Sequence, residues 1–348
     1  MSSWVAGATV VKSILTRVPT VLSAAAIFAS AARPRELRPY APFVKSICAG
    51  TIHFGRKVIS ANFFSVLSRL RNSVSDESLI AMIIGHFEVV RVLNHNNGRA
   101  LTRRYGNYAN KYVTEYLAKS FDKKTRREIL KFHHRYLADH VTDSFYEQIL
   151  QGRSNLWTET IDGNCYAISI SFNPDWHSEG DISLTFDKND VSLYEVSFTI
   201  VPGRLIGCAA AQALLVGRVQ GRKGQAEPIR VGTRACHDIA PPNLLLAAVQ
   251  SVAGVLGIEA IAGVSNDEQL AKSVYDAAGV YFDYDTFWET YLVEKRGARI
   301  YTIPVPFPEK PIKQVSSAHR RRARNKRRLK KQIADRVGAA FAEKFSKA

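Results

Sequence analysis

A cluster of carboxylates and aromatic side chains near residue 285 holds the residue types that proton transfer needs. It reads Tyr281-Phe282-Asp283-Tyr284-Asp285-Thr286-Phe287-Trp288. Tyr284 or Asp285 could handle the proton of an amine or hydroxyl acceptor, because a phenol and a carboxylate can both serve as general acid or base. The alternative makes Asp283 or Asp285 a helix N-cap, with Phe287 and Trp288 packed in the core.

A basic turn that contains two glycines is a candidate anion site. It follows a long apolar stretch and reads Gln220-Gly221-Arg222-Lys223-Gly224-Gln225. Backbone amides and basic side chains at such a turn could hold a phosphate or pyrophosphate. Its spacing is neither that of a P-loop nor that of a dinucleotide fingerprint. The alternative is an exposed bend that is basic for solubility.

The histidines offer weaker candidates. His237 stands beside Asp238, and a histidine next to a carboxylate can act as a general base. Neighbours in a chain usually point apart, so a plain surface pair is the alternative. His133, His134 and His140 fall on one predicted helix, but no HExxH-like spacing is present and we expect no metal site.

The charge of the chain is strongly positive, with a formal net charge of +17. Nine basic side chains lie between Arg320 and Lys331, and the excess favours anionic partners such as nucleic acid or an anionic membrane surface. The interleaved aromatic residues that mark platforms for stacking single-stranded bases are absent from this run. The alternative is a solvated helix, or one that docks on the protein itself.

The cysteines and the N-terminus bear on the compartment. The four cysteines are far apart, with no CxxC pair, as expected for reduced and packed thiols. Val18–Ala32 is an apolar run after two basic residues and mimics a secretory signal, but it carries Pro19 and is short for a membrane span. We expect a location in the cytoplasm or on the inner membrane surface rather than export.

Hydrophobic patterns divide the chain into three parts. Residues 1–150 are expected to be helical, including a helix over Leu79–Leu93 and one over Phe121–Leu137 with its Lys, Arg and His residues facing solvent. Residues 151–312 are expected to form a core domain. Residues 313–348 are expected to form a basic C-terminal helix, whose apolar stripe recurs every four residues at Leu329, Ile333, Val337, Phe341 and Phe345.

The core domain begins with an antiparallel meander. Tyr166–Phe172, Ile182–Phe186 and Tyr194–Ile200 alternate apolar and polar residues, which predicts half-buried strands. Ala209–Val219 is almost wholly apolar and predicts a strand covered on both faces, although a short buried helix has the same pattern. A helix capped by Asn243 and closed by Gly257 follows, and then a buried strand over Ile258–Val264.

Several ordered pieces of the chain together resemble the VirK/YbjX family of bacterial proteins. They span roughly Trp157–Val337 and include Tyr194–Phe198, Val219-Gln220-Gly221, Ile229–Thr233, Pro242–Leu246, Leu256-Gly257-Ile258, Val264-Ser265-Asn266, Asp283–Trp288 and the basic run after Pro311. The chain departs from the family at Asp238–Pro242 and at Gln269–Tyr275. The resemblance implies an association with virulence, envelope stress and resistance to antimicrobial peptides.

The order of elements is also similar to the GNAT acyltransferase core, which has a meander, a strand, a turn, a helix and a further strand. That similarity implies an acyl thioester donor in the gap between two splayed strands, with the donor phosphate at Gln220, Gly221, Arg222 and Gly224. Asn266 and Tyr275 would match polar residues after the second strand. A departure is the separation of about 18 residues between the turn and the long helix, and Ile229–Cys236 is the candidate for supplying the helix N-terminus instead.

We therefore expect an α+β protein: a helical N-terminal region, a mixed and mainly antiparallel sheet with GNAT-like order, and a basic C-terminal helix. The expected activity is acyl transfer with acyl-CoA or acyl-carrier protein as donor and no other cofactor. In that scheme Tyr284 or Asp285 acts on the acceptor proton, with His237 as a third candidate. The alternative is a non-enzymatic factor that binds nucleic acid or an anionic membrane through Arg320–Lys331.

Overall fold

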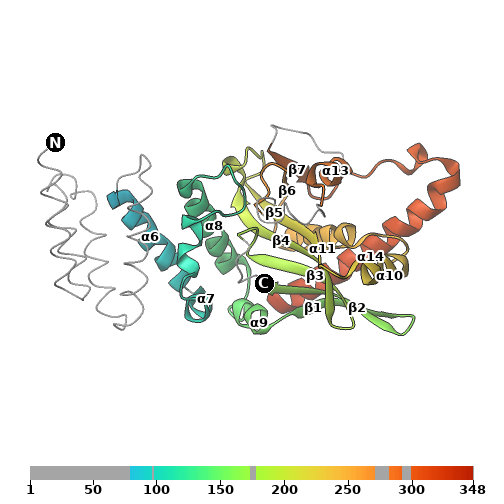
Figure 1. Cartoon of the computed structure of the whole chain (residues 1–348), viewed down its shortest axis with the longest axis horizontal. Helices are drawn as coiled ribbons and strands as arrows, with labels where there is room; N and C mark the ends of the chain where they lie inside the picture. Colours follow the sequence, from blue (N-terminus) through green and yellow to red (C-terminus); the bar gives the residue numbers. More distant parts are fainter. Residues whose placement is uncertain (1–78, 96–97, 173–177, 271–281, 292–298, 348) are drawn as a thin grey trace, which may run out of the picture. The chain divides into compact units, whose positions relative to one another are not determined.

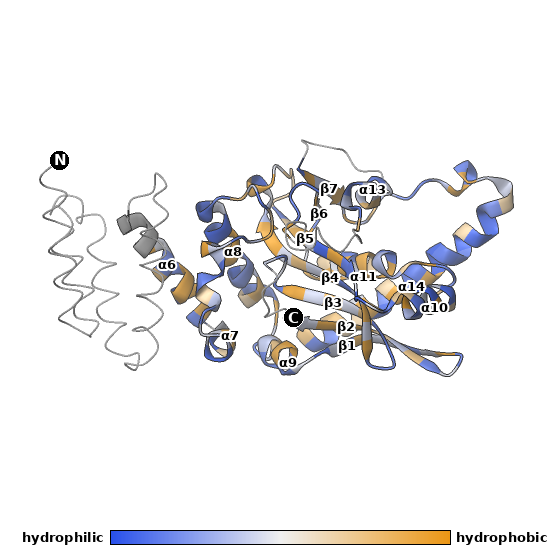
Figure 2. Cartoon of the chain, viewed as in Figure 1, coloured by the Kyte–Doolittle hydropathy of each residue, from blue (hydrophilic) through white to orange (hydrophobic). Residues whose placement is uncertain are grey.

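The structure is a computed structural model that describes residues 79–95, 98–172, 178–270, 282–291 and 299–347 (Figure 1). Within them, helices precede a mixed sheet and a long helix ends the chain, which confirms the α+β class. The expectations for Val18–Ala32 and Tyr275 lie outside these residues. In the hydropathy colouring of Figure 2, apolar colour follows the central strands, and the start of the last helix is mostly hydrophilic.

Seven strands form one sheet in the order β1-β2-β3-β4-β5-β6-β7. Neighbours pair antiparallel except β5 and β6, which run parallel. The predicted meander is thus confirmed, and the apolar stretch before the turn is a strand. The strands are β1 (Ser154–Ile161), β2 (Asn164–Phe172), β3 (Ile182–Lys188), β4 (Val191–Pro202), β5 (Gln212–Gly221), β6 (Ala260–Val264) and β7 (Ile300–Pro304).

The helices before the sheet include the two that the sequence predicts. They are α6 (Leu79–Asn94), α7 (Gly98–Arg104), the 3-10 turn η2 (Tyr108–Val113), α8 (Lys123–His140) and α9 (Phe145–Gln151). Asp122 caps α8, because its side chain accepts a hydrogen bond from the Thr125 N–H. The expected solvent face of α8 is wrong: His133 and His134 are buried, and both contact the cluster described below.

The remaining helices follow the meander. They are η3 (Gly203–Leu205), α10 (Ala226–Ala235), α11 (Pro241–Val255), α13 (Tyr284–Glu289), η4 (Ile312–Gln314), η5 (Ser317–His319) and α14 (Arg320–Phe345). α11 starts at Pro241 with Ala240 as N-cap, so the expected cap at Asn243 is wrong, and Asn243 instead accepts a hydrogen bond from the Tyr291 hydroxyl. Gly257, just beyond the end of α11, has a φ of 68°, which glycine adopts without strain.

Helices cover the sheet so completely that the expected half-buried strands are wrong. β3 is buried from Ile182 to Asp187, and β4 from Leu193 to Pro202, polar positions included. α11 packs on β3 and β4, α14 packs on α11 and β1, and α8 packs on β4 (Figure 1). Alternate residues of a strand face opposite sides of a sheet, so the polar residues of β3 and β4 form one continuous buried polar face. That face positions the candidate site.

Candidate functional site in a gap between parallel strands

β5 and β6 pair over a short length, and the pairing stops where β6 ends at Val264. Their register joins Leu214 to Ile261, Leu215 to Ala262 and Val216 to Gly263. β5 continues to Gly221, and beyond Val216 none of the described strand residues pairs with its β6-facing edge. The parallel pair therefore leaves a gap beside the second half of β5.

A β-bulge at Gly217 marks the start of this gap. On β4, Phe198 pairs with Val216 and Ser197 pairs with Arg218, so Gly217 is the extra residue. A side chain does not fit there, because a Cβ atom on Gly217 would lie 2.3 Å from the carbonyl oxygen of Glu179. Glycine thus allows the segment before β3 to cross close to β5.

Tyr284, the first residue of α13, fills the gap. Its hydroxyl oxygen accepts a hydrogen bond from the Val219 N–H at 3.0 Å and lies 3.5 Å from the Val219 carbonyl oxygen. Gln269 Nε2 donates to the same hydroxyl at 3.1 Å. Burial, together with the nearby charge of Glu179, raises the pKa of Tyr284 well above its ordinary value, so the phenol is protonated at neutral pH.

Buried charges surround this hydroxyl. Glu179 Oε2 accepts a hydrogen bond from Arg218 Nη1 at 2.8 Å, and the two side chains are 2% and 7% exposed. Gln269 donates to the other Glu179 oxygen. Burial lowers the pKa of Arg218, but Glu179 and Glu195 outweigh it and raise that pKa overall. We call Glu179, Glu195, Arg218, Gln269 and Tyr284 the gap cluster.

The gap cluster extends along β4 toward the basic turn. Glu195 Oε1 accepts hydrogen bonds at 2.9 Å from the hydroxyls of Ser183 and Ser197. Glu195 Oε2 lies 2.8 Å from Arg222 Nη2. Within the described structure, Nε of Arg218 is buried without a hydrogen-bond partner. The gap cluster thus contains a buried donor that a ligand could satisfy.

The basic turn leads directly into a helix. Gln220 and Gly221 end β5, Gly224 has a φ of 79°, and α10 begins at Ala226. The sequence prediction placed the start of this helix at Ile229, which is too late. α10 therefore lies within the separation of about 18 residues between the turn and the long helix α11. The N-terminal N–H groups of α10 follow the turn, and no side chain caps them.

The structure brings Asn266 and the acidic pair together. Asn266 Oδ1 accepts from the Tyr284 N–H at 2.9 Å, and its Nδ2 donates to Asp283 Oδ1 at 2.9 Å. Asp283 is the N-cap of α13, and its hydrogen bonds, the one from the Thr286 side chain foremost, lower its pKa to about 2. Phe287 and Trp288 are buried in the core. The alternative that the sequence offered, with Asp283 as a helix N-cap and with Phe287 and Trp288 packed in the core, is thus confirmed.

Asp285 lies one residue further into α13 and is half-buried. Its Oδ1 accepts a hydrogen bond from the Tyr301 hydroxyl of β7 at 2.8 Å. The Asn266 N–H lies 3.4 Å from the same oxygen. Asp285 therefore connects α13 to the ends of β6 and β7, beside Tyr284.

His237 and Asp238 form no dyad. Both are exposed on the connection between α10 and α11, and both have positive φ angles, of 54° and 58°. The carboxylate of Asp238 binds Arg322 of α14 at 2.7 Å. Among the described residues, no hydrogen bond or ion pair joins the His237 side chain to the gap cluster, so His237 lacks the partner that the catalytic hypothesis requires.

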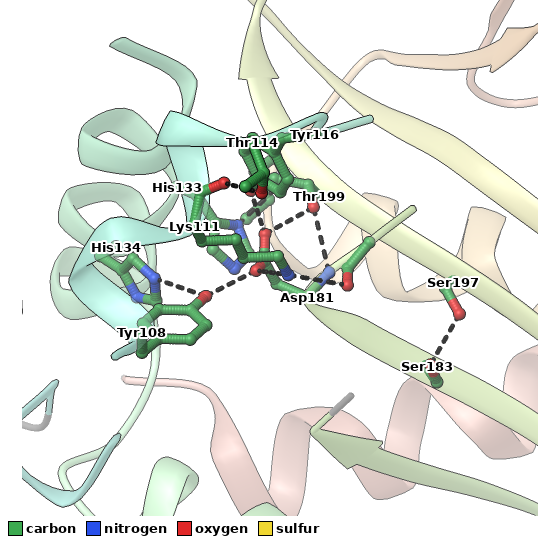
Figure 3. Close-up of polar contacts among 12 residues, drawn as sticks. Tyr108, Lys111, Thr114, Tyr116, His133, His134, Asp181, Ser183, Ser197 and Thr199 are labelled. Carbon is green, nitrogen blue, oxygen red and sulfur yellow. Dashed lines mark hydrogen bonds and ion pairs between the residues drawn. The ribbon is translucent and has the colours of Figure 1, made fainter. Parts of the chain in front are cut away.

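A second buried cluster lies on the same polar face, around Asp181 (Figure 3). Its carboxylate is fully buried and accepts hydrogen bonds from Tyr108 at 2.5 Å, Lys111 at 2.7 Å, Thr199 at 2.7 Å and Tyr116. Burial raises the pKa of Asp181, but the charge of Lys111 outweighs it and holds the pKa well below its ordinary value. We call these five residues the Asp181 cluster.

Two buried histidines of α8 adjoin the Asp181 cluster. His134 lies 3.0 Å from the Tyr108 hydroxyl and 2.5 Å from the Tyr146 hydroxyl. His133 Nδ1 accepts a hydrogen bond from the Ile200 N–H at 3.1 Å, which places the ring proton on Nε2. Burial lowers both pKa values, that of His133 to about 4. In the described ranges no group of His, Cys, Asp or Glu side chains is placed to hold a metal ion.

The sequence did not identify the two central carboxylates. Glu179 and Asp181 stand in a short polar segment, Ser178-Glu179-Gly180-Asp181, which is typical of an exposed connector. Their partners come from distant parts of the chain, such as Gln269, 90 residues after Glu179. The one available signal was two acidic residues flanking a glycine at the start of an apolar strand.

Fold and site define a class: an α+β protein with a seven-stranded mixed sheet and a polar cluster beside β5, where its parallel pairing has ended. The family model described as "Protein of unknown function (DUF535)" matches residues 84–339, which is well over half of the chain. The chain therefore belongs to the DUF535 family, and the VirK/YbjX resemblance is confirmed.

A curated relative supports this membership. The uncharacterized protein YbjX of Escherichia coli (strain K12) is 25% identical over 238 residues, which cover 66% of this chain and 69% of YbjX. No solved structure gives a significant match. None of the helices in the described part of the chain combines the length and apolar character of a membrane span.

Proposed function

We propose that this protein transfers an acyl group from a thioester donor to an amine or hydroxyl acceptor, with the donor in the gap between β5 and β6. The observation that carries the proposal is the end of strand pairing after Val216, where β6 stops and β5 continues to Gly221. Beyond it, the Val219 N–H points into the gap and is held by a side chain rather than by a strand. A free strand edge of this kind can bind the amide groups of an extended donor arm.

The turn after β5 supplies the second part of the donor site. Gly221 ends the strand, and α10 starts at Ala226 with uncapped N–H groups. Helix N-termini favour phosphate through their free N–H groups and the helix dipole. Arg222 is 47% exposed and Lys223 is exposed, so both can reach an anion in solvent. Gln220, Gly221, Arg222 and Gly224 are therefore proposed as the phosphate contacts, with acyl-CoA or acyl-carrier protein as donor.

Tyr284 and Asp285 receive separate roles. In acyl transfer the acceptor lone pair attacks the thioester carbonyl, the carbon–sulfur bond breaks, and the thiolate leaves. The raised pKa keeps the Tyr284 phenol protonated and makes it a weak acid. We therefore propose that Tyr284 donates a hydrogen bond to the sulfur as it leaves as the thiolate, rather than acting as a base. Asp285 is the carboxylate beside it and is proposed to take the acceptor proton. Asn266 holds the Tyr284 backbone and is a positioning residue.

The gap must open for this reaction, because Tyr284 occupies the Val219 N–H in the structure. A donor carbonyl that replaced the tyrosine hydroxyl would restore the hydrogen bond of the strand edge. Arg218 Nε offers a further buried donor. We assign the reaction to the virulence and envelope-stress setting that the VirK/YbjX resemblance implies, in the cytoplasm or at the inner membrane surface.

Calorimetric titration of the full chain with acetyl-, octanoyl- and palmitoyl-CoA tests the proposal. We expect saturable binding that Gly221→Asp weakens at least tenfold, because a carboxylate beside the turn repels the donor phosphates. Gly221→Asn is the matched control: it has the same size without the charge. It meets the same flexible side chains, Ile229 and Tyr194 at about 3.1 Å, and should bind more tightly than the Asp variant.

The titration has clear contrary outcomes. Equal donor binding by the Asp and Asn variants would show that the donor phosphate does not bind at the turn. If no acyl-CoA bound, the titration would be repeated with an acylated carrier protein, since its phosphopantetheine arm presents the same thioester. Absence of binding to both donors would overturn the proposal.

A further inference from the structure

One side of α14 carries three arginines that make no contact with the rest of the described chain. Arg321, Arg324 and Arg328 are exposed, and no hydrogen bond or ion pair joins them to another described residue. They are three and four residues apart, so they lie along one face of the helix. We call them the outer arginine stripe. At 1.5 Å per residue it is about 10 Å long.

The outer arginine stripe faces away from the body of the protein. Ile333 is nine residues after Arg324, and Val337 is nine residues after Arg328. Nine residues are 2.5 helical turns, so each apolar residue points opposite to its arginine. Ile333 and Val337 are buried, and α14 packs on α11. Figure 1 shows the start of α14 extending beyond the sheet, and in Figure 2 it is mostly hydrophilic.

The other basic residues hold this part of α14 in place. Arg322 binds the Asp238 carboxylate at 2.7 Å, and Lys326 donates to the Asp238 carbonyl oxygen at 2.6 Å. Arg320 donates to the carbonyl oxygen of Val315 at 2.9 Å, and Arg327 lies 3.4 Å from Glu309. The helix backbone that carries the outer arginine stripe is therefore held in place before any partner binds, which lowers the entropy cost of binding.

The spacing of the outer arginine stripe destabilises the helix that carries it. Arg321 and Arg324, and then Arg324 and Arg328, are like-charge neighbours, which each destabilise a helix by about 0.2–0.5 kcal/mol. Cations in the first turn also oppose the helix dipole, and α14 has no acidic residue there. A chain that needed only a docked helix would keep the inward contacts and could place neutral residues on the outer face. An external anion would reverse this repulsion.

We propose that the outer arginine stripe binds the phosphate backbone of a duplex nucleic acid. Arginine matches phosphate with two parallel hydrogen bonds, and a duplex carries the regular phosphate rows that a straight stripe can follow. A lipid surface fits less well, because a membrane-binding helix inserts an apolar face, and here that face is packed on α11. Single strands fit less well too, since Arg320–Lys331 has no aromatic residue on which bases could stack.

Fluorescence anisotropy with labelled duplex DNA, duplex RNA and single-stranded DNA tests this inference on the full chain. Three neutralised phosphates predict a slope of about −2.7 in a plot of log affinity against log salt. The triple change Arg321→Gln, Arg324→Gln and Arg328→Gln should reduce the magnitude of that slope by about 2.7 and weaken duplex binding at least tenfold at low salt. Glutamine is nearly as good a helix former as arginine, so α14 should persist.

A matched control removes three exposed charges elsewhere. Lys119, Lys124 and Arg135 are exposed, and their change to glutamine alters the net charge equally. Retained duplex binding by this control, with loss in the stripe variant, supports the proposal. Equal loss in both variants, unchanged binding by the stripe variant, or binding to anionic phosphatidylglycerol vesicles without binding to a duplex would each overturn it. The inference is independent of acyl transfer, so either can fail alone.

Discussion

Glu179 and Asp181 are buried carboxylates on either side of Gly180, and their hydrogen-bonding environments differ. Asp181 accepts hydrogen bonds from Tyr108, Lys111, Thr199 and Tyr116, so both of its oxygens are occupied by donors. Glu179 has Arg218 on one oxygen and Gln269 on the other, and Nε of that arginine is buried without a hydrogen-bond partner in the described structure. The Asp181 carboxylate is thus saturated by donors, although Nε2 of the adjoining His133 is buried without a hydrogen-bond partner in the described structure. The gap cluster keeps an unsatisfied donor within itself, beside the end of strand pairing.

The difference follows from what each carboxylate joins. Asp181 connects the segment before α8 to β3 and β4, where regular strand pairing continues. Glu179 lies beside the bulge of β5, where pairing with β6 has ended, and side chains satisfy the backbone there. Complete networks fix a fold, whereas incomplete ones beside a free strand edge leave groups that a ligand can satisfy. This contrast favours the gap cluster as the site.

The largest test of the contrast compares Asp181→Asn with Glu179→Gln. Asp181→Asn leaves Lys111 partly buried without its counter-charge, and losing one partner of a buried pair costs about 3–5 kcal/mol. Glu179→Gln should cost less, about 1–3 kcal/mol, because Arg218 keeps Glu195 nearby at 3.9 Å. Urea unfolding of both variants measures the two losses. Equal losses would show that the two clusters share one structural role.

A smaller effect is expected from pH, and on the Asp181 side. His133 has a pKa of about 4 in the fold, below its ordinary value of 6.5, because it is buried. As pH falls below 6.5 the unfolded chain binds this proton first, so the stabilisation present above pH 6.5 is lost as pH falls toward 4. Between pH 7 and pH 5 the loss from His133 is about 2 kcal/mol.

Urea unfolding at pH 7 and pH 5 measures this loss. His133→Gln removes the share of this histidine and should reduce the dependence by about 2 kcal/mol. His134, whose pKa burial also lowers, keeps contributing, whereas the gap cluster contains no histidine. A wild-type stability that rose toward pH 5 would contradict the assignment, since the direction of the His133 pKa shift fixes the sign of the effect.

The contrast also marks the limit of prediction from the sequence. Local patterns predicted the meander, the buried β5 strand, and the helix with its apolar stripe from Ile333 to Phe345. This was possible because the hydrophobic periods of strands and helices are visible within a few consecutive residues. Tyr284 was identified from its residue type and its acidic neighbours. The carboxylates that it faces were missed, because their burial depends on a bulge at Gly217 and on partners far away in the chain. The burial of His133 was missed for the same reason.

The smallest chemical change in this comparison is the removal of one hydroxyl group from each cluster. Tyr116→Phe deletes a hydrogen bond to a charged carboxylate and should cost about 1.5–3 kcal/mol, whereas Tyr284→Phe deletes neutral hydrogen bonds and should cost about 1 kcal/mol. If Tyr284 also stabilises the leaving thiolate by a hydrogen bond, its variant should lose acyl transfer about 100-fold with donor binding retained. Tyr116→Phe should leave transfer unchanged once its lower stability is allowed for. Unfolding curves with a free-thiol assay separate these effects, and equal rates for the two variants would remove Tyr284 from the reaction while leaving its place in the fold intact.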